Sequence, residues 1–149
     1  MYSGEIGITS TANSTESALD STATYTGTGG TFGTQAQIPS GDSVTQQAIY
    51  HTQINHNLLA DWLLCNVNKV SGGSTPTVTI RGWSYSRVTE TNYEIFRMDI
   101  DTSVENFVEL RPSQPFPIGG REVLYFTAES SLNNTIVSLR FSGIEQRVN

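Results

Sequence analysis

The sequence has 149 residues but only one cysteine and one lysine, and each scarcity excludes something. Cys65 alone cannot form an intrachain disulfide, and it ends the apolar run that begins at Trp62, so we expect a buried, unreactive thiol. A nucleic-acid backbone is bound by clustered lysine and arginine side chains. Lys69 stands alone, the arginines are scattered from Arg81 to Arg147, and the net charge is −6. We therefore expect no nucleic-acid partner.

Long apolar runs are missing too. No apolar run approaches the roughly 20 residues that a membrane-spanning helix needs. The first residues also lack the basic start and apolar centre of a signal peptide. We expect a soluble protein that is made in the cytoplasm and has no membrane partner.

The common catalytic and cofactor-binding motifs are equally absent. The sequence contains no Gly-x-Ser-x-Gly, His-Glu-x-x-His or Cys-x-x-Cys pattern and no glycine-rich phosphate loop. His51 and His56 are five residues apart, and as zinc ligands they would need Cys65 or Asp61 as a further partner. Ordinary loop histidines are the simpler interpretation. We therefore expect that the protein is not an enzyme and has no catalytic residue. We also expect no metal site, no cofactor and no small-molecule substrate.

One acidic cluster, formed by Asp99, Asp101 and Glu105, has the oxygen ligands that Ca²⁺ prefers. The glycine-bearing loop of an EF-hand is missing from it. Asp99 and Asp101 are two residues apart in an alternating segment, so they share one face of a strand. We expect that face to be solvated, with Arg97 or Arg81 as partners of the carboxylates.

Alternation of apolar and polar residues is abundant, and it predicts β-strands. Turn-forming residues separate the alternating segments, at Thr91-Asn92, Pro115 to Gly120 and Asn133-Asn134. The four clearest strands are predicted at residues 77–85, 93–100, 121–128 and 134–141.

Weaker signals fill the remaining chain. Residues 42–50 alternate, and Phe107 to Leu110 reads as a short strand. Residues 54–67 fit either a short amphipathic helix or a buried strand, and we favour a strand over residues 61–69. About seven or eight strands at this spacing predict an all-β fold, an antiparallel β-sandwich with a jelly roll as its simplest closure.

Residues 1–34 differ in composition from the rest of the chain. Twenty of them are Ser, Thr or Gly, and none is Lys or Arg. Such a segment buries too little apolar surface to offset its own ordering entropy. Two interpretations remain: a disordered tail, or an extended arm that becomes ordered against another subunit. We favour the arm and predict a sandwich domain over residues 35–149. The candidate anchors in the arm are Ile6, Ile8, Leu19, Tyr25 and Phe32.

The architecture resembles the small capsid decoration (cement) proteins of tailed bacteriophages. The resemblance rests on Ile38-Pro-Ser-Gly41, on Pro115 to Gly120 and on the segment from Asn133 to Glu145. It implies a jelly-roll-like homo-trimer that binds the major capsid protein on the outer surface of a filled head, so the protein would be found in the virion. The implied contact residues are Ile6, Ile8, Tyr25 and Phe32 of the arm, with Trp83 and Tyr85 of the body.

A second interpretation is a carbohydrate- or receptor-binding β-sandwich of a phage tail or fibre. Trp83, Tyr85 and Tyr93 flank a predicted loop, where aromatic rings could stack on sugars.

Overall fold

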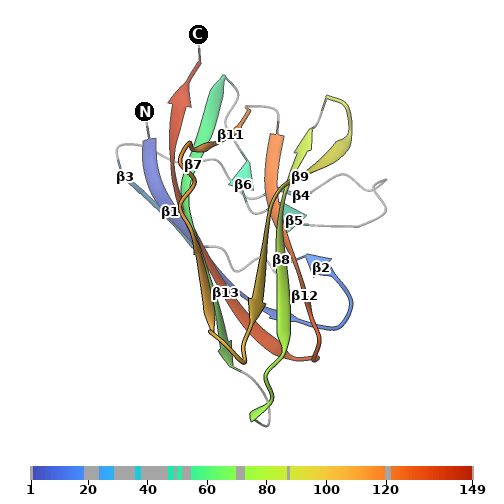
Figure 1. The fold of residues 1–149 in the computed structure, drawn as a ribbon. Coiled ribbons are helices and arrows are strands. Elements are labelled where there is room, and N and C mark those ends of the chain that lie inside the picture. Colours follow the sequence, from blue (N-terminus) through green and yellow to red (C-terminus); the bar gives the residue numbers. More distant parts are fainter. Residues whose placement is uncertain are drawn as a thin grey trace.

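The computed structural model describes residues 2–18, 24–28, 36–37, 47–48, 50–51, 55–69, 73–86, 88–119 and 122–148. Within these ranges the regular elements are β-strands, numbered β1 to β13 (Figure 1). The same ranges contain no helix that is long and apolar enough to cross a membrane.

The strands form two main antiparallel sheets. Sheet A has the order β10-β7-β13-β1-β3, with β11 also paired to β7. Its strands are β1 (Tyr2–Ala12), β3 (Thr24–Thr28), β7 (His56–Lys69), β10 (Phe107–Leu110), β11 (Phe116–Ile118) and β13 (Thr135–Arg147). Sheet B has the order β2-β12-β8-β9, with β6 also paired to β12. Its strands are β2 (Ser17–Ala18), β6 (Tyr50–His51), β8 (Thr77–Ser86), β9 (Thr91–Asp101) and β12 (Glu122–Ser130). A separate pair joins β4 (Ala36–Gln37) to β5 (Gln47–Ala48).

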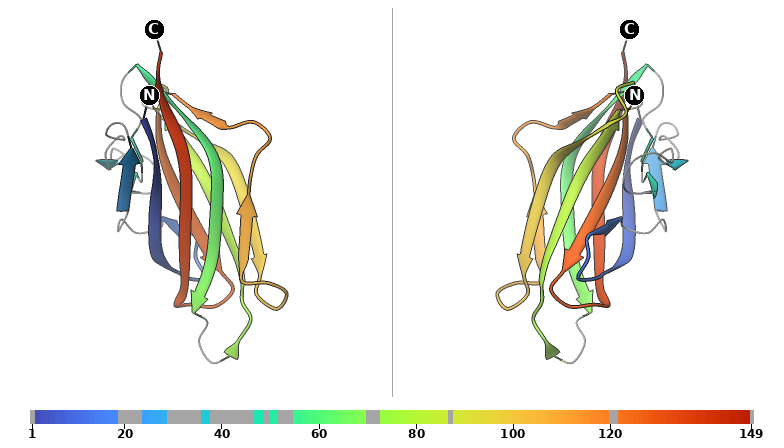
Figure 2. Two further views of the ribbon diagram at one scale, coloured as in Figure 1. Left: turned by 90° about the vertical axis from the view of Figure 1, so that its left-hand side faces the viewer. Right: turned by 90° about the vertical axis from the view of Figure 1, so that its right-hand side faces the viewer.

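The pairing of the strands is nested. Strand β1 pairs with β13, β2 with β12, β7 with β10, and β8 with β9. These eight strands therefore form one long antiparallel ribbon folded back on itself, and successive pairs of the ribbon alternate between sheet A and sheet B. This is the double-sheet jelly roll. The predicted all-β antiparallel sandwich is confirmed: the two sheets face each other in Figure 1, and in Figure 2 one lies in front of the other.

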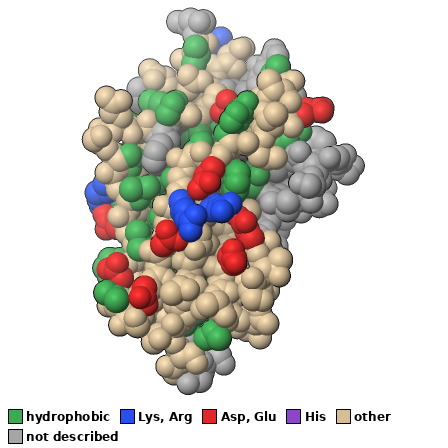
Figure 3. All heavy atoms as spheres, turned by 45° about the vertical axis from the view of Figure 1, so that its right-hand side comes forward, with side chains coloured by type: hydrophobic (Ala, Val, Ile, Leu, Met, Phe, Trp, Pro, Cys, Tyr) green, Lys and Arg blue, Asp and Glu red, His purple; other side chains and the backbone are tan. Residues whose placement is uncertain are grey.

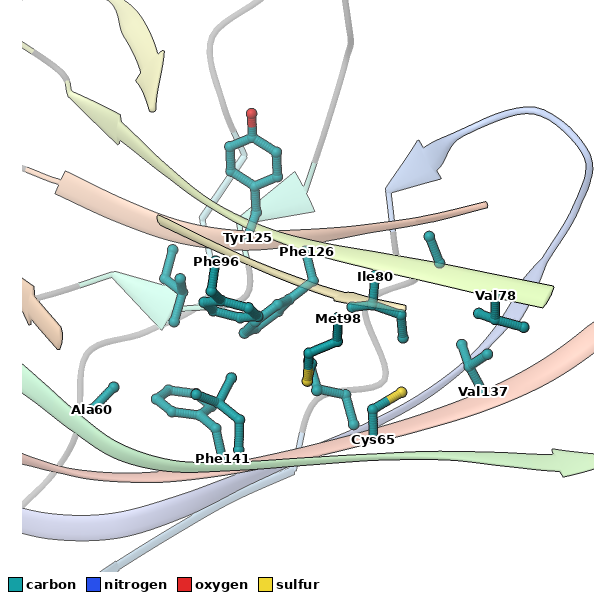
Figure 4. Close-up of a cluster of buried hydrophobic side chains, with 14 of the residues drawn as sticks. Ala60, Cys65, Val78, Ile80, Phe96, Met98, Tyr125, Phe126, Val137 and Phe141 are labelled. Atoms are coloured by element: carbon teal, nitrogen blue, oxygen red, sulfur yellow. The ribbon is translucent and has the colours of Figure 1, made fainter. Parts of the chain in front are cut away.

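The core fills the space between the sheets. In Figure 4, Phe96 and Phe126 of sheet B face Phe141 of sheet A. The ring centroid of Phe126 lies 5.6 Å from that of Phe96 and 6.1 Å from that of Phe141. Full burial of one large apolar side chain contributes about 1.5–3 kcal/mol. Cys65 belongs to this core, and burial raises the pKa of its thiol to about 12, which confirms the predicted buried thiol.

A glycine makes room for one of these rings. Gly82 of β8 lies opposite Phe96 of β9, and a Cβ atom at Gly82 would lie 2.1 Å from Cε1 of that ring. The register then shifts, because Trp83 is paired with Glu94 and Ile95 has no partner in the β8–β9 register. Such a bulge changes the direction in which the following side chains point.

Residues 2–12 and 24–28 differ from our prediction of an extended arm over residues 1–34, because they are strands of sheet A. All of β1, from Tyr2 to Ala12, pairs with β13 in the middle of the sandwich, and β3 pairs with β1. The backbone partners come from β13, so this segment does not depend on its own apolar surface to become ordered. Residues 19–23 and 29–34 lie outside the described part of the chain.

Two further predictions are settled by the strand bounds. Residues 61–69 are a strand, as predicted, and the helical alternative for residues 54–67 is wrong because β7 begins at His56. The predicted turn from Pro115 to Gly120 contains the short strand β11, which pairs with the first part of β7. Pro117 is accommodated there because β11 lies at the edge of sheet A, where a missing N–H is tolerated.

Candidate functional site

Trp83 is the centre of a polar and aromatic cluster on the outer face of sheet B. Its side chain is half-buried, and the guanidinium carbon of Arg81 lies 5.5 Å from the centroid of its ring. The ring of Tyr125 on β12 is nearly parallel to it, with centroids 6.2 Å apart and planes inclined by 7°. An arginine over an indole ring is a favourable cation–π arrangement.

Hydrogen bonds fix the indole. Its Nε1–H donates to Oγ1 of Thr127 at 2.9 Å, and the Thr127 hydroxyl donates to Oε1 of Glu16 at 2.7 Å. The same Glu16 oxygen lies 3.5 Å from Nη1 of Arg81. Glu16 belongs to the connection between β1 and β2, so the network joins that connection to β8 and β12. These contacts hold Trp83 in one orientation at the surface.

Neighbouring charges on the same sheet are also paired. Arg97 Nε lies 3.3 Å from Oδ2 of Asp99, and the Thr79 hydroxyl donates to Oδ1 of Asp99 at 2.8 Å. Basic side chains surrounded by acidic ones are visible at the centre of Figure 3. The Arg97 and Asp99 side chains are 51% and 63% exposed, so this ion pair contributes little to stability.

In the acidic cluster, Asp101 ends β9 and is bonded to the turn that follows. Oδ1 of Asp101 accepts hydrogen bonds from the hydroxyl of Ser103 at 2.6 Å and from its backbone N–H at 3.0 Å. These two bonds lower the pKa of Asp101, the hydroxyl having the larger effect. Among the described residues, no group of three or more His, Cys, Asp or Glu side chains could hold a metal ion. The expected pairing of Asp99 with Arg97 is confirmed.

The two predicted body contacts differ in accessibility. Trp83 is half-buried and reaches the surface, whereas Tyr85 is only 3% exposed and offers little of its ring to a partner. Tyr93, predicted beside them, is 51% exposed at the start of β9. The sequence analysis did not select Tyr125. Its side chain points away from the core, in the direction opposite to that of its neighbour Phe126, as Figure 4 shows.

The predicted arm contacts lie in sheet A. The backbone register pairs Ile6 with both Phe141 and Tyr25, and pairs Ile8 with Leu139. Ile6, Ile8 and Tyr25 are thus brought together, on a different sheet from Trp83. Phe32 lies outside the described residues.

A second surface, on the outer face of sheet A, was also missed. Leu59, Trp62 and Leu64 of β7 pair with Ile144, Ser142 and Arg140 of β13. The side chains of Leu59, Trp62, Leu64, Ile136 and Ile144 are half-buried on this face, and we call them the apolar band. The guanidinium carbon of Arg111 lies 5.8 Å from the ring centroid of Trp62. The sequence does contain a signal for this second surface, because residues 58–65 are apolar at nearly every position and not at alternate positions.

Comparisons with known proteins found a distant structural likeness. No protein-family model matches this sequence, and neither does any curated protein sequence. Among solved structures, a chain from Desmodium yellow mottle tymovirus aligns with a TM-score of 0.41 and 14% sequence identity. The alignment covers 99% of this chain and 87% of that chain.

Proposed function

We propose that this protein is a structural component of a virus particle, a decoration (cement) protein that binds the outside of a bacteriophage head. The observation that carries the proposal is the nested jelly roll with its interior filled by side chains from both sheets. Such a domain is a stiff block that acts through its outer surfaces, and jelly rolls serve as structural units in viral capsids.

Charge and surface chemistry support this role. An acidic chain with a net charge of −6 does not compete for the packaged nucleic acid. The cluster around Trp83 and the apolar band supply contact surfaces on the two opposite sheets. Aromatic and arginine side chains of this kind are enriched at the centres of protein interfaces. In this proposal the partner is the major capsid protein, and copies of the chain assemble as a trimer at three-fold positions of the shell.

Binding to heads tests the proposal. Purified protein is mixed with heads from the virus that encodes it, and the mixture is separated on a sucrose gradient. We expect the protein to migrate with the heads and to raise their temperature of disruption. Saturation at about 100 times the Kd would stabilise each binding site by about 2.7 kcal/mol. Protein that stays at the top of the gradient at every concentration would contradict the proposal.

A second candidate function is carbohydrate binding, favoured by the half-buried indole of Trp83 beside Arg81 and Glu16. Aromatic rings stack on sugars, while carboxylate and guanidinium groups bond their hydroxyls. A glycan array followed by calorimetry tests it. Binding that is lost in Trp83→Ala but kept in Trp62→Ala, the matched control on the other sheet, would favour this function. The absence of binding to any glycan would exclude it.

A further inference from the structure

Strand β7 is apolar on both of its faces. Leu58, Leu63 and Cys65 point into the core, while Leu59, Trp62 and Leu64 lie on the outer face of sheet A. A strand with one solvated face normally alternates, whereas a strand covered on both faces reads as a nearly continuous apolar run. In Figure 2 (left), β1, β13 and β7 lie side by side, and no described strand lies in front of β13 and β7. No described strand therefore covers the apolar band, whose side chains are half-buried.

Among the side chains that the structure describes, four charged ones surround the middle of the apolar band. Arg140 of β13 is paired with Leu64, which is paired in turn with Glu109 of β10. This row has a positive charge on the β13 side and a negative charge on the β10 side. Arg140 and Glu109 are exposed, and so are Asp61 and Arg111, the two charged residues of the next row.

The next row has the opposite polarity. Asp61 bonds to the Ser142 hydroxyl of β13 at 2.8 Å, and Arg111 lies over Trp62 on the β10 side. Arg111 also donates a hydrogen bond to Glu109, which lowers the pKa of that carboxyl. The charges around Leu64 and Trp62 thus alternate in sign: positive and negative in one row, negative and positive in the other.

An alternating set of four charges is complementary to its own copy. Consider a second copy that is turned over about a two-fold axis parallel to the strands. Arg140 of the second copy then faces Glu109 of the first, and Asp61 of the second copy faces Arg111 of the first. When the axis lies across the strands, Arg140 faces Asp61 and Arg111 faces Glu109. Opposite charges meet in both arrangements, and the apolar bands stack on one another. The chain as a whole has a charge of −6 and repels its copies, but these four charges sum to zero.

We propose that the apolar band packs against the same band of a second copy of this chain, about a two-fold axis. Sheets that pack face to face lie about 10 Å apart, with their side chains interdigitating. Such a contact is isologous, so each copy contributes the same residues. The inference does not depend on the proposed function, since self-association through sheet A is compatible with any role of the other surfaces.

The solution mass by light scattering tests the inference, with the full chain of 16.3 kDa as the starting protein. We expect two chains per particle, or six if the proposed trimer contact also forms. Leu64→Lys, which places a charge in the centre of the band, should halve that mass. Circular dichroism and thermal unfolding establish that each variant is folded. Arg97→Glu, an exposed charge reversal on sheet B, is the matched control and should leave the mass unchanged.

Charge reversal provides an independent test that does not disturb the apolar band. Arg140→Glu should raise the dissociation constant of the pair of copies at least about tenfold, because each copy contributes one reversed contact. The second substitution Glu109→Arg restores association for an axis along the strands, and Asp61→Arg restores it for an axis across them. A wild-type mass of one or three chains, or a folded Leu64→Lys variant with the wild-type mass, would overturn the inference. So would an Arg140→Glu effect that neither second substitution reverses.

Discussion

The contact between Gly82 and Phe96 allows a quantitative prediction. Adding a methyl group in Gly82→Ala places a Cβ atom 2.1 Å from Cε1 and 2.3 Å from Cζ of the ring, far inside contact distance. The backbone at Gly82 is outside the left-handed region, so alanine is strained there only by this collision. The ring cannot move outward without losing its contact with Phe126, 5.6 Å away between centroids.

The expected cost follows from overpacking and from the lost ring contacts. Overpacking in a well-packed core costs about 1–3 kcal/mol, so we expect Gly82→Ala to destabilise the fold by about 2–3 kcal/mol. Phe96→Ala should cost about 3–5 kcal/mol by leaving a cavity. The double variant combines Gly82→Ala with Phe96→Ala, so the collision is absent. Alanine in a strand is also less destabilising than glycine, by roughly 0.5–1 kcal/mol. The double variant should therefore be as stable as Phe96→Ala alone, or slightly more stable.

Urea denaturation followed by circular dichroism measures all four members of this double-mutant cycle. We expect a coupling energy of about 2–4 kcal/mol between the two positions, whereas the effects of independent sites add to within about 0.5 kcal/mol. Additive effects of the two substitutions would refute it, because they would show that the ring does not lie against Gly82.

Four further predictions concern the strand β1, the indole network, the turn and the thiol. Deleting residues 1–18 should abolish cooperative unfolding in a calorimeter, because β13 loses one of its two partner strands; an arm outside the sandwich would leave the melting temperature unchanged. Thr127→Val should lower stability by about 1–3 kcal/mol in urea denaturation, because Trp83 Nε1 loses its acceptor; an unchanged midpoint would contradict this. The lowered pKa of Asp101 means that its carboxylate stabilises the fold above the ordinary pKa of 3.8, an effect lost as the pH falls through the lower folded value. The melting temperature of Asp101→Asn should therefore be lower than that of the wild type at pH 7 and should converge with it in strong acid, and a constant difference would contradict this. Cys65 should react with a thiol reagent only at the rate of global unfolding, and rapid labelling of the folded protein would disprove its burial.

The strands with clean alternation could be predicted from the sequence. Val78 and Ile80 alternate with threonine and arginine, and in the structure they face the core while Thr79 and Arg81 face outward. Such a pattern identifies both the element and its buried face. The strand β1 could not be recognised this way, because its order depends on a ladder with β13, which begins more than 120 residues later. A long-range partner leaves no trace in local composition.

The contact residues were only partly predictable. Trp83 was selected as an aromatic beside a loop, and it does reach the surface. Tyr85, two residues later on the same strand, is buried, and nothing in its neighbours along the chain distinguishes the two. The partners that fix Trp83 come from Thr127 and Glu16, which are distant in the sequence, so the network exists only after the ribbon has folded.

A cryo-electron microscopy map of the virus particle that the proposed role implies would test that role most directly. We expect density on the outside of the head, beyond the major capsid protein, into which the jelly roll of β1 to β13 fits with its outer faces in contact with neighbours. Density for the jelly roll only in the tail or its fibres would contradict the proposed decoration of the head and would favour carbohydrate or receptor binding. A particle that lacks this density altogether would refute a structural role in the virion.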